Sequence, residues 1–336
     1  NRVGILEEAL AGILDQPSEN VFEEEIIVVP NKALERRLQL FLASRNGISM
    51  NVRFPFPRSY CGELFRHVLN EVPDRTAFDL KALSWRIMQI LPSLKLKAGF
   101  EEVNHFLRED SDGLKHFQFS KRVAGLYDQY LIFRASMIRD WDEGKETHWQ
   151  AVLWRAISEG MAAEHSSSLY FKFMKMALNQ PENLDSIPSR ICLFLTGSLP
   201  PRFLDIFSAV ATQKEVHLFL MQPTPEFWGD VRSRKYRDQD EPSQLDLNFS
   251  SPSDSNEEVD HSLLASFGKS GRDFLNLIWE TDRIAPLLQD DSGFQDPIST
   301  EHSSNMLTLV QSDLYRMRQP SSDEKQAVEL NEGSIQ

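Results

Sequence analysis

The sequence predicts an α/β protein in which a parallel-sheet domain carries a large inserted helical domain. Short continuous apolar runs followed by helical spacing occur at 24–30 and 31–43, and again at 191–197 and 200–211. Between about residues 60 and 179 the pattern contains several helical stretches and no strand-like alternation. Strand-to-helix transitions on both sides of a helical stretch favour one sheet interrupted by an insertion.

The first elements follow from the spacing of apolar residues. Within residues 2–15 these residues recur at one-turn intervals, which predicts a helix closed by Pro17. Residues 24–30 (EEIIVVP) contain a short continuous run of apolar, β-branched residues, as in a buried strand. Residues 31–43 return to helical spacing. The apolar faces of the two helices consist of Leu6, Leu10, Ile13, Leu14, Leu34, Leu38, Phe41 and Leu42.

The middle of the chain predicts a series of helices, at 60–69, 78–91, 100–107, 120–134, 149–157 and 169–178.

Strand signals return after these helices. Residues 191–197 (ICLFLTG), 200–211 and 215–221 predict a strand, a helix and a strand. A connection of this length implies parallel strands and a right-handed crossover. Two amphipathic helices are expected further on, at 263–278 and 305–317.

These patterns predict the domain organisation. Residues 1–59 and 184–320 form the α/β domain, and residues 60–183 form the inserted helical domain. Residues 237–261 contain eight acidic residues against one basic residue, so we expect an acidic disordered loop. The polar tail, 321–336, is expected to lead into a further domain.

Composition excludes several classes of protein. The net charge of −14 argues against a histone-like polyanion binder, although a local basic groove remains compatible with it. Two cysteines cannot form a disulfide framework or a four-cysteine zinc site, and they favour a cytoplasmic location. No apolar run approaches the roughly 20 residues that span a bilayer, so we expect no membrane association. Glu7 and Glu8 within the first helix argue against a signal peptide.

One stretch partly matches a phosphate-binding loop. Gly268, Lys269 and Ser270 give the end of the GxxxxGK[ST] pattern, but Leu263 occupies the position of its first glycine. Such a loop also follows a strand, whereas the acidic stretch lies upstream here. A helix start or a surface turn is the alternative that we favour.

A second pattern has metal-ligating residue types. Glu101, His105 and Glu109 are spaced at i, i+4 and i+8, which would place them on one helical face. A metal site in a helical bundle needs ligands from several helices, and no second ExxH motif occurs. HExxH, CxxC and GxSxG motifs are absent. We therefore interpret this face as a solvated polar surface and expect neither a metal nor any other cofactor.

Basic residues gather between Pro30 and Arg66, where there are seven against two acidic residues. Aromatic residues and prolines interleave with them in 52–60 (VRFPFPRSY), a composition suited to contact with a nucleic-acid backbone. By composition alone, a solvated charged face explains the same residues. The basic residues are Lys32, Arg36, Arg37, Arg45, Arg53, Arg58 and Arg66.

Residues 26–38 (IIVVPNKALERRL) resemble motif Ia of superfamily 1 helicases, in which the turn after a strand contacts single-stranded DNA. Beyond this motif, the chain resembles the RecC family, the gamma subunits of exodeoxyribonuclease V, over essentially its whole length. The strings that carry the resemblance, in order, are SWRIMQILP, LYDQYLIFR, LTGSLPPRFLDIF, FWGD, LLASFGKSGRDFLNLI and NMLTLVQSDL.

The resemblance implies an inactive superfamily 1 helicase-like fold and the amino-terminal portion of a longer subunit. The implied role is that of a scaffold for a RecB-like motor-nuclease and a RecD-like motor on forked DNA. In this family the subunit guides the unwound 3′-ended single strand and reads the regulatory Chi sequence.

The resemblance also carries four recognition positions onto LYDQYLIFR: Leu126, Asp128, Gln129 and Arg134. Arg can donate two hydrogen bonds to guanine, Asp can accept from an exocyclic amine, and Gln can do both. An ion pair within the protein is an equally good explanation for the Asp and the Arg.

Other recognition positions of the family differ in this chain. Pro30, Lys32 and Arg36 replace polar uncharged residues, Phe56 replaces another apolar residue, Gly62 replaces a Trp and Gly125 replaces an acid. Lys32 and Arg36, as cations in place of uncharged polar residues, favour contact with phosphate over discrimination between bases. The candidate DNA-binding residues are thus Lys32, Arg36, Arg37, Arg53 and Phe56, together with Leu126, Asp128, Gln129 and Arg134.

Three functions remain open at this point. The first is a non-catalytic DNA-binding and scaffolding subunit of an ATP-dependent exonuclease and helicase complex. The second is an active nucleotide-driven motor. The third is a purely structural scaffold in which Arg36, Arg37 and Arg53 bind acidic surfaces of a partner.

Overall fold

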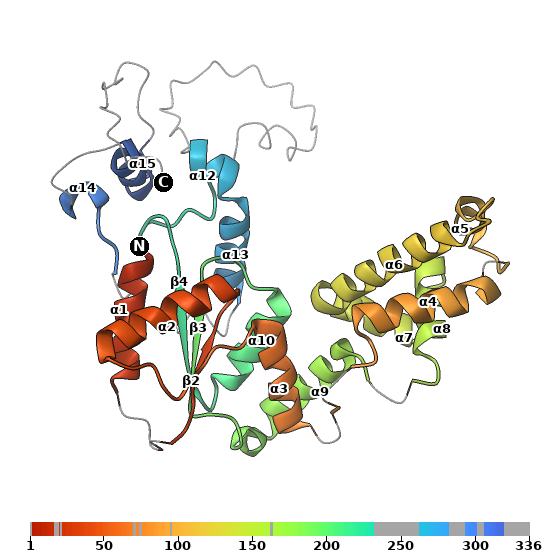
Figure 1. Cartoon of the computed structure of the whole chain (residues 1–336), viewed down its shortest axis with the longest axis horizontal. Helices are drawn as coiled ribbons and strands as arrows, with labels where there is room; N and C mark the ends of the chain where they lie inside the picture. Colours follow the sequence, from red (N-terminus) through yellow and green to blue (C-terminus); the bar gives the residue numbers. More distant parts are fainter. Residues whose placement is uncertain are drawn as a thin grey trace, which may run out of the picture. The chain divides into compact units, whose positions relative to one another are not determined.

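A computed structural model describes residues 2–16, 20, 22–69, 72–73, 76–94, 96–161, 164–231, 262–281, 293–300 and 306–318 (Figure 1). The chain divides into two compact units. The first unit comprises 1–52, 192–199 and 217–336, and the second unit comprises 53–191 and 200–216. The expected acidic loop at 237–261 and the tail at 321–336 lie outside the described residues.

In the described ranges, the sheet has four strands in the order β2-β1-β3-β4. The strands are β1 (Glu25–Val28), β2 (Val52–Arg53), β3 (Arg190–Leu195) and β4 (Glu215–Leu220). The amide of Glu215 donates to the carbonyl of Ser189, and that of Met221 donates to Leu195 with the same residue offset, so β3 and β4 run parallel. The α/β class with a parallel sheet is confirmed.

Position in the sheet explains the composition of the strands. Every residue of the central strand β3 is buried, which is why residues 191–195 form a continuous apolar run after Arg190. The edge strand β4 is mostly half-buried. Strand β2 was not expected, because two residues are too short to produce a period.

Two helices of the first unit match the expectation. Helix α1 (Val3–Leu14) buries Leu6 and Leu10. Helix α2 (Lys32–Asn46) begins after Asn31, whose side chain accepts a hydrogen bond from the amide of Leu34, and it ends at Gly47 in the left-handed region.

The later helices of the first unit require one correction. The single helix expected at 263–278 is wrong, because α12 (Ser262–Phe267) and α13 (Lys269–Glu280) are separated at Gly268. Helices α14 (Pro297–Thr300) and α15 (Met306–Tyr315) follow. A small core joins Trp228, Val231, Leu264 and Ala265, against which Leu275, Leu314 and Met317 pack.

Every element that the structure describes from Pro57 to Leu184 is a helix. These elements belong to the second unit: α3 (Pro57–Val68), α4 (Leu80–Leu94), α5 (Glu101–Phe106), α6 (Leu114–Phe133), α7 (Ala135–Asp142), α8 (Trp149–Ser158), α9 (Ser166–Asn179) and the short 3-10 helix η1 (Pro181–Leu184). Helix α10 (Pro201–Val210) belongs to the same unit.

An aromatic core holds the helices of the second unit together. Helices α4 and α6 run side by side (Figure 1), and Tyr127 of α6 lies in contact with the rings of Trp141 and Trp154. All three side chains are fully buried, and the Tyr127 hydroxyl donates to the carbonyl of Gln150. Such rings contribute large buried areas, so α6 is held firmly along its inner face.

The described helices include none with the length and apolar character needed to cross a membrane.

Candidate nucleic-acid interface

The outer face of α6 forms one wall of a groove of about 390 Å³ in the second unit. Its cations are Lys121 and Arg122, which are exposed and make no hydrogen bond or ion pair with the described part of the chain. The lining residues are Leu80, Gln118, Lys121, Arg122, Gly125, Leu126 and Gln129, none of which is acidic. Six of these recur at one-turn spacing along α6, opposite its buried residues. The groove therefore combines cations with amide groups that can donate and accept hydrogen bonds.

Two of the four positions expected on α6 lie in this groove, namely Leu126 and Gln129. Arg134 lies at the junction of α6 and α7, where its backbone amide donates to the carbonyl of Tyr130. Its side chain is exposed and has no partner among the described residues. The resemblance to the RecC family did not point to Lys121 or Arg122. Their spacing from Gln129 along one helix is the sequence signal that would have placed them on the same face.

Asp128 is held by an ion pair rather than being open. Both guanidinium Nη atoms of Arg58 in α3 donate to its two carboxylate oxygens, at 3.0 and 2.6 Å. The hydrogen bonds to Asp128 raise the pKa of Arg58. This pair neutralises Asp128 and is the ion-pair alternative that the sequence left open.

A second cavity of the same unit, of about 510 Å³, is lined by Phe56 and by three arginines, Arg58, Arg66 and Arg202. Arg202 at the start of α10 is 6% exposed. Its Nη1 atom donates to the carbonyl of Leu131, and its Nε atom has no hydrogen-bond partner within the residues that the structure describes. Burial lowers the pKa of Arg202 to about 10. Because no described carboxylate pairs with this buried cation, this wall of the cavity is favourable for an anion.

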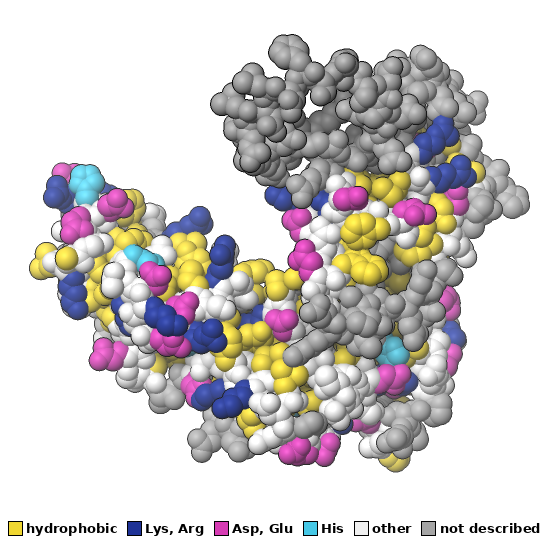
Figure 2. Space-filling view, turned by 180° about the vertical axis from the view of Figure 1, so that it is seen from behind, with side chains coloured by type: hydrophobic (Ala, Val, Ile, Leu, Met, Phe, Trp, Pro, Cys, Tyr) yellow, Lys and Arg dark blue, Asp and Glu magenta, His cyan; other side chains and the backbone are white. Residues whose placement is uncertain are grey.

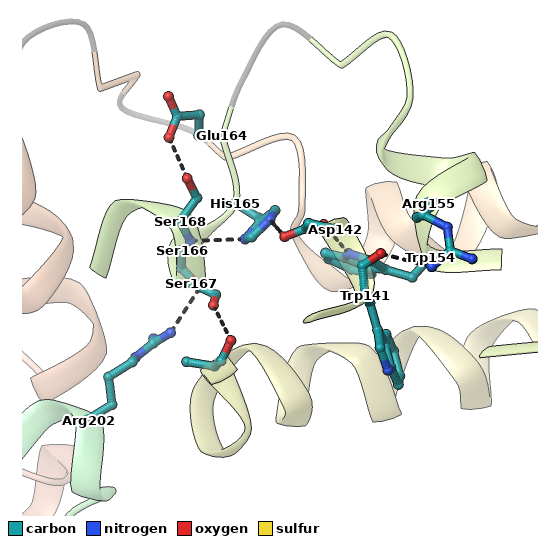
Figure 3. Close-up of polar contacts among 11 residues, drawn as sticks. Trp141, Asp142, Trp154, Arg155, Glu164, His165, Ser166, Ser167, Ser168 and Arg202 are labelled. Carbon is teal, nitrogen blue, oxygen red and sulfur yellow. Dashed lines mark hydrogen bonds and ion pairs between the residues drawn. The ribbon is translucent and has the colours of Figure 1, made fainter. Parts of the chain in front are cut away.

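A hydrogen-bond network orders the helix that faces Arg202 (Figure 3). Asp142 accepts from the indole of Trp154 at 2.8 Å and contacts Nε2 of His165 at 2.9 Å. The Nδ1 atom of His165 accepts from the amide of Ser168 and so caps α9. This cap sets the first turn of α9, where the hydroxyl of Ser166 lies 3.5 Å from Arg202.

Burial also affects the thiol in the wall of this cavity. Cys61 is 2% exposed, and burial raises the pKa of its thiol. A thiol of this kind is inert rather than nucleophilic.

Of the candidate DNA-binding residues Lys32, Arg36 and Arg37 at the start of α2, two are paired with carboxylates; we call these three residues the α2 strip. Lys32 contacts Glu35 at 2.7 Å, and Arg37 donates to both carboxylate oxygens of the buried Glu7. Arg36 is exposed and has no side-chain partner in the described ranges.

Two further candidate DNA-binding residues, Arg53 and Phe56, lie in the second unit. Arg53 pairs with Glu63 at 2.6 Å and also lies 5.9 Å from the centre of the Tyr60 ring. Phe56 precedes α3 and is 37% exposed in the wall of the larger cavity.

Packing, and not phosphate binding, explains the glycine of the Gly268-Lys269-Ser270 stretch. Helix α12, not a strand, precedes it, and α13 starts at Lys269. A Cβ atom at position 268 would lie 2.4 Å from the carbonyl oxygen of Leu264 and 2.8 Å from the ring of Trp228. Glycine is thus needed here because the buried indole leaves no room for a side chain.

The expected helical face of Glu101, His105 and Glu109 is wrong, because α5 ends at Phe106. Glu109 has a φ of 55° and lies outside the helix. Among the described residues no group of three His, Cys, Asp or Glu side chains could hold a metal ion.

Comparison with known proteins agrees with the strings noted in the sequence. The profile of the RecC N-terminal domain matches residues 1–317. This chain belongs to the RecC family. The RecBCD enzyme subunit RecC of Escherichia coli K12 is 30% identical over 94% of the chain, and that of Haemophilus influenzae is 28% identical over 80%. RecC of Mycolicibacterium smegmatis is 27% identical over 84% of the chain.

The matched part of these RecC proteins is limited. The chain spans 30% of the length of the Escherichia coli protein, 29% of the Haemophilus protein and 25% of the Mycolicibacterium protein.

Proposed function

We propose that the chain is the DNA-binding and scaffolding part of a non-catalytic RecC subunit. Its complex would be an ATP-dependent exodeoxyribonuclease and helicase that repairs double-strand breaks by recombination. A RecB-like motor-nuclease, a RecD-like motor and forked DNA are the proposed partners, and the cytoplasm is the proposed location. The subunit would guide the unwound 3′-ended strand and read a Chi-like sequence.

The observation that carries this proposal is the acid-free groove on α6. Lys121 and Arg122 have no partner within the described residues, so their charges are available to phosphates. Gln129 in the same groove can bond to base edges. A single strand needs this combination of backbone cations and groups that contact bases.

The fold supports an inactive helicase-like origin. A parallel sheet with a strand, a short turn and helix α2 has the form of motif Ia. We extend the proposal to the domain organisation, with residues 60–183 as an insertion into an α/β domain of 1–59 and 184–320. We further propose that the chain neither binds nor hydrolyses ATP, because packing of Trp228 accounts for the Gly-Lys-Ser stretch.

Phosphate and base contacts can be separated by their response to salt. Arg122→Ala in the complete complex should lower the salt slope of single-strand binding by about 0.7, equally for every sequence. The Lys32→Ala and Arg36→Ala double variant should also weaken all sequences alike. Arg134→Ala should cost about 1–3 kcal/mol only on strands that contain its base. Fluorescence anisotropy with a set of oligonucleotides over a salt series measures all three.

Arg139→Ala is the matched control, because this cation belongs to α7 and covers the ring of Phe171 at 4.4 Å. If both Arg122→Ala and the double variant kept the wild-type affinity and salt slope for single-stranded DNA, the proposed contacts of these residues with the strand would be contradicted. ATPase activity that Lys269→Ala abolishes would contradict the non-catalytic role.

The purely structural scaffold is the second candidate. It was based on Arg36, Arg37 and Arg53, and two of these already have internal carboxylate partners, Glu7 and Glu63. Binding to partner subunits without measurable single-strand affinity at low salt would favour the scaffold.

A further inference from the structure

Two aromatic side chains lie in contact on the surface of the second unit. Trp85 of α4 is 62% exposed and Phe117 of α6 is 38% exposed. Their ring centres are 5.9 Å apart with an angle of 49° between the planes. The buried face of α4 consists of other residues, among them Leu83 and Ile87, so the core does not require the exposed indole.

The charged side chains of the two helices that carry this pair are almost all basic. Helices α4 and α6 contain five basic residues, Lys81, Arg86, Lys115, Lys121 and Arg122, and a single acidic residue, Asp128. The acid is neutralised by Arg58, in a chain whose net charge is −14. Helices α4 and α6 are therefore locally positive, although the chain as a whole carries a negative net charge.

Two of these cations flank the rings. Lys81 lies one helical turn before Trp85, and Lys121 lies one turn after Phe117, so each shares a helical face with a ring. Both lysines are exposed and have no hydrogen bond or ion pair with the part of the chain that the structure describes. On the face seen in Figure 2, hydrophobic, basic and acidic side chains of the second unit lie next to one another.

We propose that Trp85 and Phe117 form a stacking platform for the bases of single-stranded nucleic acid, with Lys81 and Lys121 holding the flanking phosphates. This inference rests on the proposed function and adds a subsite to it. Lys121 belongs to both the platform and the groove, so the two surfaces are continuous along α6.

Charge decides the choice of occupant. A protein partner would need a surface that is both apolar and strongly acidic to match rings flanked by lysines. A single strand supplies both components in every nucleotide, because each base has a face that stacks and each phosphate carries a charge. Stacking on aromatic rings also tolerates any base, so the platform adds affinity without sequence preference.

The test uses the full-length subunit in its complex, with labelled oligo-dT and an abasic strand of equal length. Trp85→Ala should weaken binding of oligo-dT about 5- to 100-fold, as expected for loss of base stacking. It should leave the abasic strand and the salt slope unchanged, because no phosphate contact is lost. Trp85→Phe should retain most of the affinity. Lys81→Ala should instead lower the slope by about 0.7 on both strands.

Trp279→Ala is the matched control, because this tryptophan is 52% exposed and lies in the first unit. It should change neither affinity. Equal losses on oligo-dT and on the abasic strand would overturn the platform, since the ring would then act only through α4. Unchanged DNA binding with weakened assembly of the complex would also overturn it and assign the rings to a protein interface. Absence of single-strand binding by the wild type would overturn the proposed function itself.

Discussion

The basic residues of α2 in the first unit and those of α4 and α6 in the second unit are used differently. Of the four basic residues of α2, three pair with carboxylates: Lys32 with Glu35, Arg37 with Glu7, and Arg45 with Asp15. Lys81, Lys121 and Arg122 have no such partner among the described residues. The number of cations in a stretch therefore does not measure the charge available to a ligand.

Burial explains why the strip on α2 is paired. The side chain of Glu7 is 5% exposed, and a buried carboxylate is costly unless a cation bonds to it. Arg37 supplies two hydrogen bonds to it, and these raise the pKa of Arg37. Lys81, Lys121 and Arg122 of α4 and α6 have no such buried carboxylate to neutralise among the described residues, so these three cations are left for solvent or a ligand.

The largest expected effect separates buried from exposed aromatic residues. Trp154 is fully buried and donates to Asp142, so Trp154→Ala should lower the free energy of unfolding by about 3–5 kcal/mol. Trp85→Ala should lower it by about 1 kcal/mol or less, through loss of the contact with Phe117. Urea unfolding followed by circular dichroism measures both. Equal losses would show that Trp85 is a core residue.

The next effect tests the packing explanation of the Gly-Lys-Ser stretch. Gly268→Ala should destabilise the first unit by about 1–3 kcal/mol, because the new methyl group meets a carbonyl and an indole. Gly12→Ala in α1 is the control, since nothing lies within 4 Å of its Cβ position, and it should stabilise by about 0.5–1 kcal/mol. Thermal melting distinguishes them. Stabilisation by both changes would contradict close packing at 268.

A smaller effect tests directly whether ion pairs with carboxylates keep the cations of α2 from contacting DNA phosphates. Glu7→Gln should release Arg37 for contact with phosphate and make the salt slope of single-strand binding steeper by about 0.7. Glu143→Gln changes the net charge equally and removes a partner of Lys145, which lies outside both proposed surfaces. It should leave the slope unchanged. Identical slopes in the two variants would mean that α2 lies away from the DNA.

The smallest effect concerns the loop before α6. The carboxylate of Asp110 accepts from the amides of Lys115 and His116. Burial acts to raise the pKa of Asp110, but the hydrogen bonds from His116 and Lys115 outweigh it and lower that pKa. Its stabilising contribution is therefore present above the unfolded pKa of about 3.9 and is lost as pH falls through the lower folded value.

Thermal melts of the wild type and of Asp110→Asn should consequently differ at pH 6 and converge on acidification below about pH 3.9. A difference that stays constant with pH would show that ionisation of Asp110 does not matter.

The sequence was sufficient for the elements with a strong period. The runs that became β1 and β3 are continuous and apolar because both strands are buried, and Asn31 and Gly47 fit the two ends of α2. It was insufficient for β2, which has two residues, and for the break at Gly268, where apolar spacing continues from one helix to the next.

For the candidate interface, the sequence determined which residue types are present and which of them share a helical face. Spacing alone brings Arg122, Leu126 and Gln129 together on α6, because a helix repeats every 3.6 residues and these positions are i, i+4 and i+7. Only the tertiary structure decided which charges are free and which rings meet. Arg58 reaches Asp128 across 70 residues, Arg37 reaches Glu7 across 30, and Trp85 meets Phe117 from another helix. Such contacts depend on how the helices pack, and local periodicity contains no information about packing between distant segments.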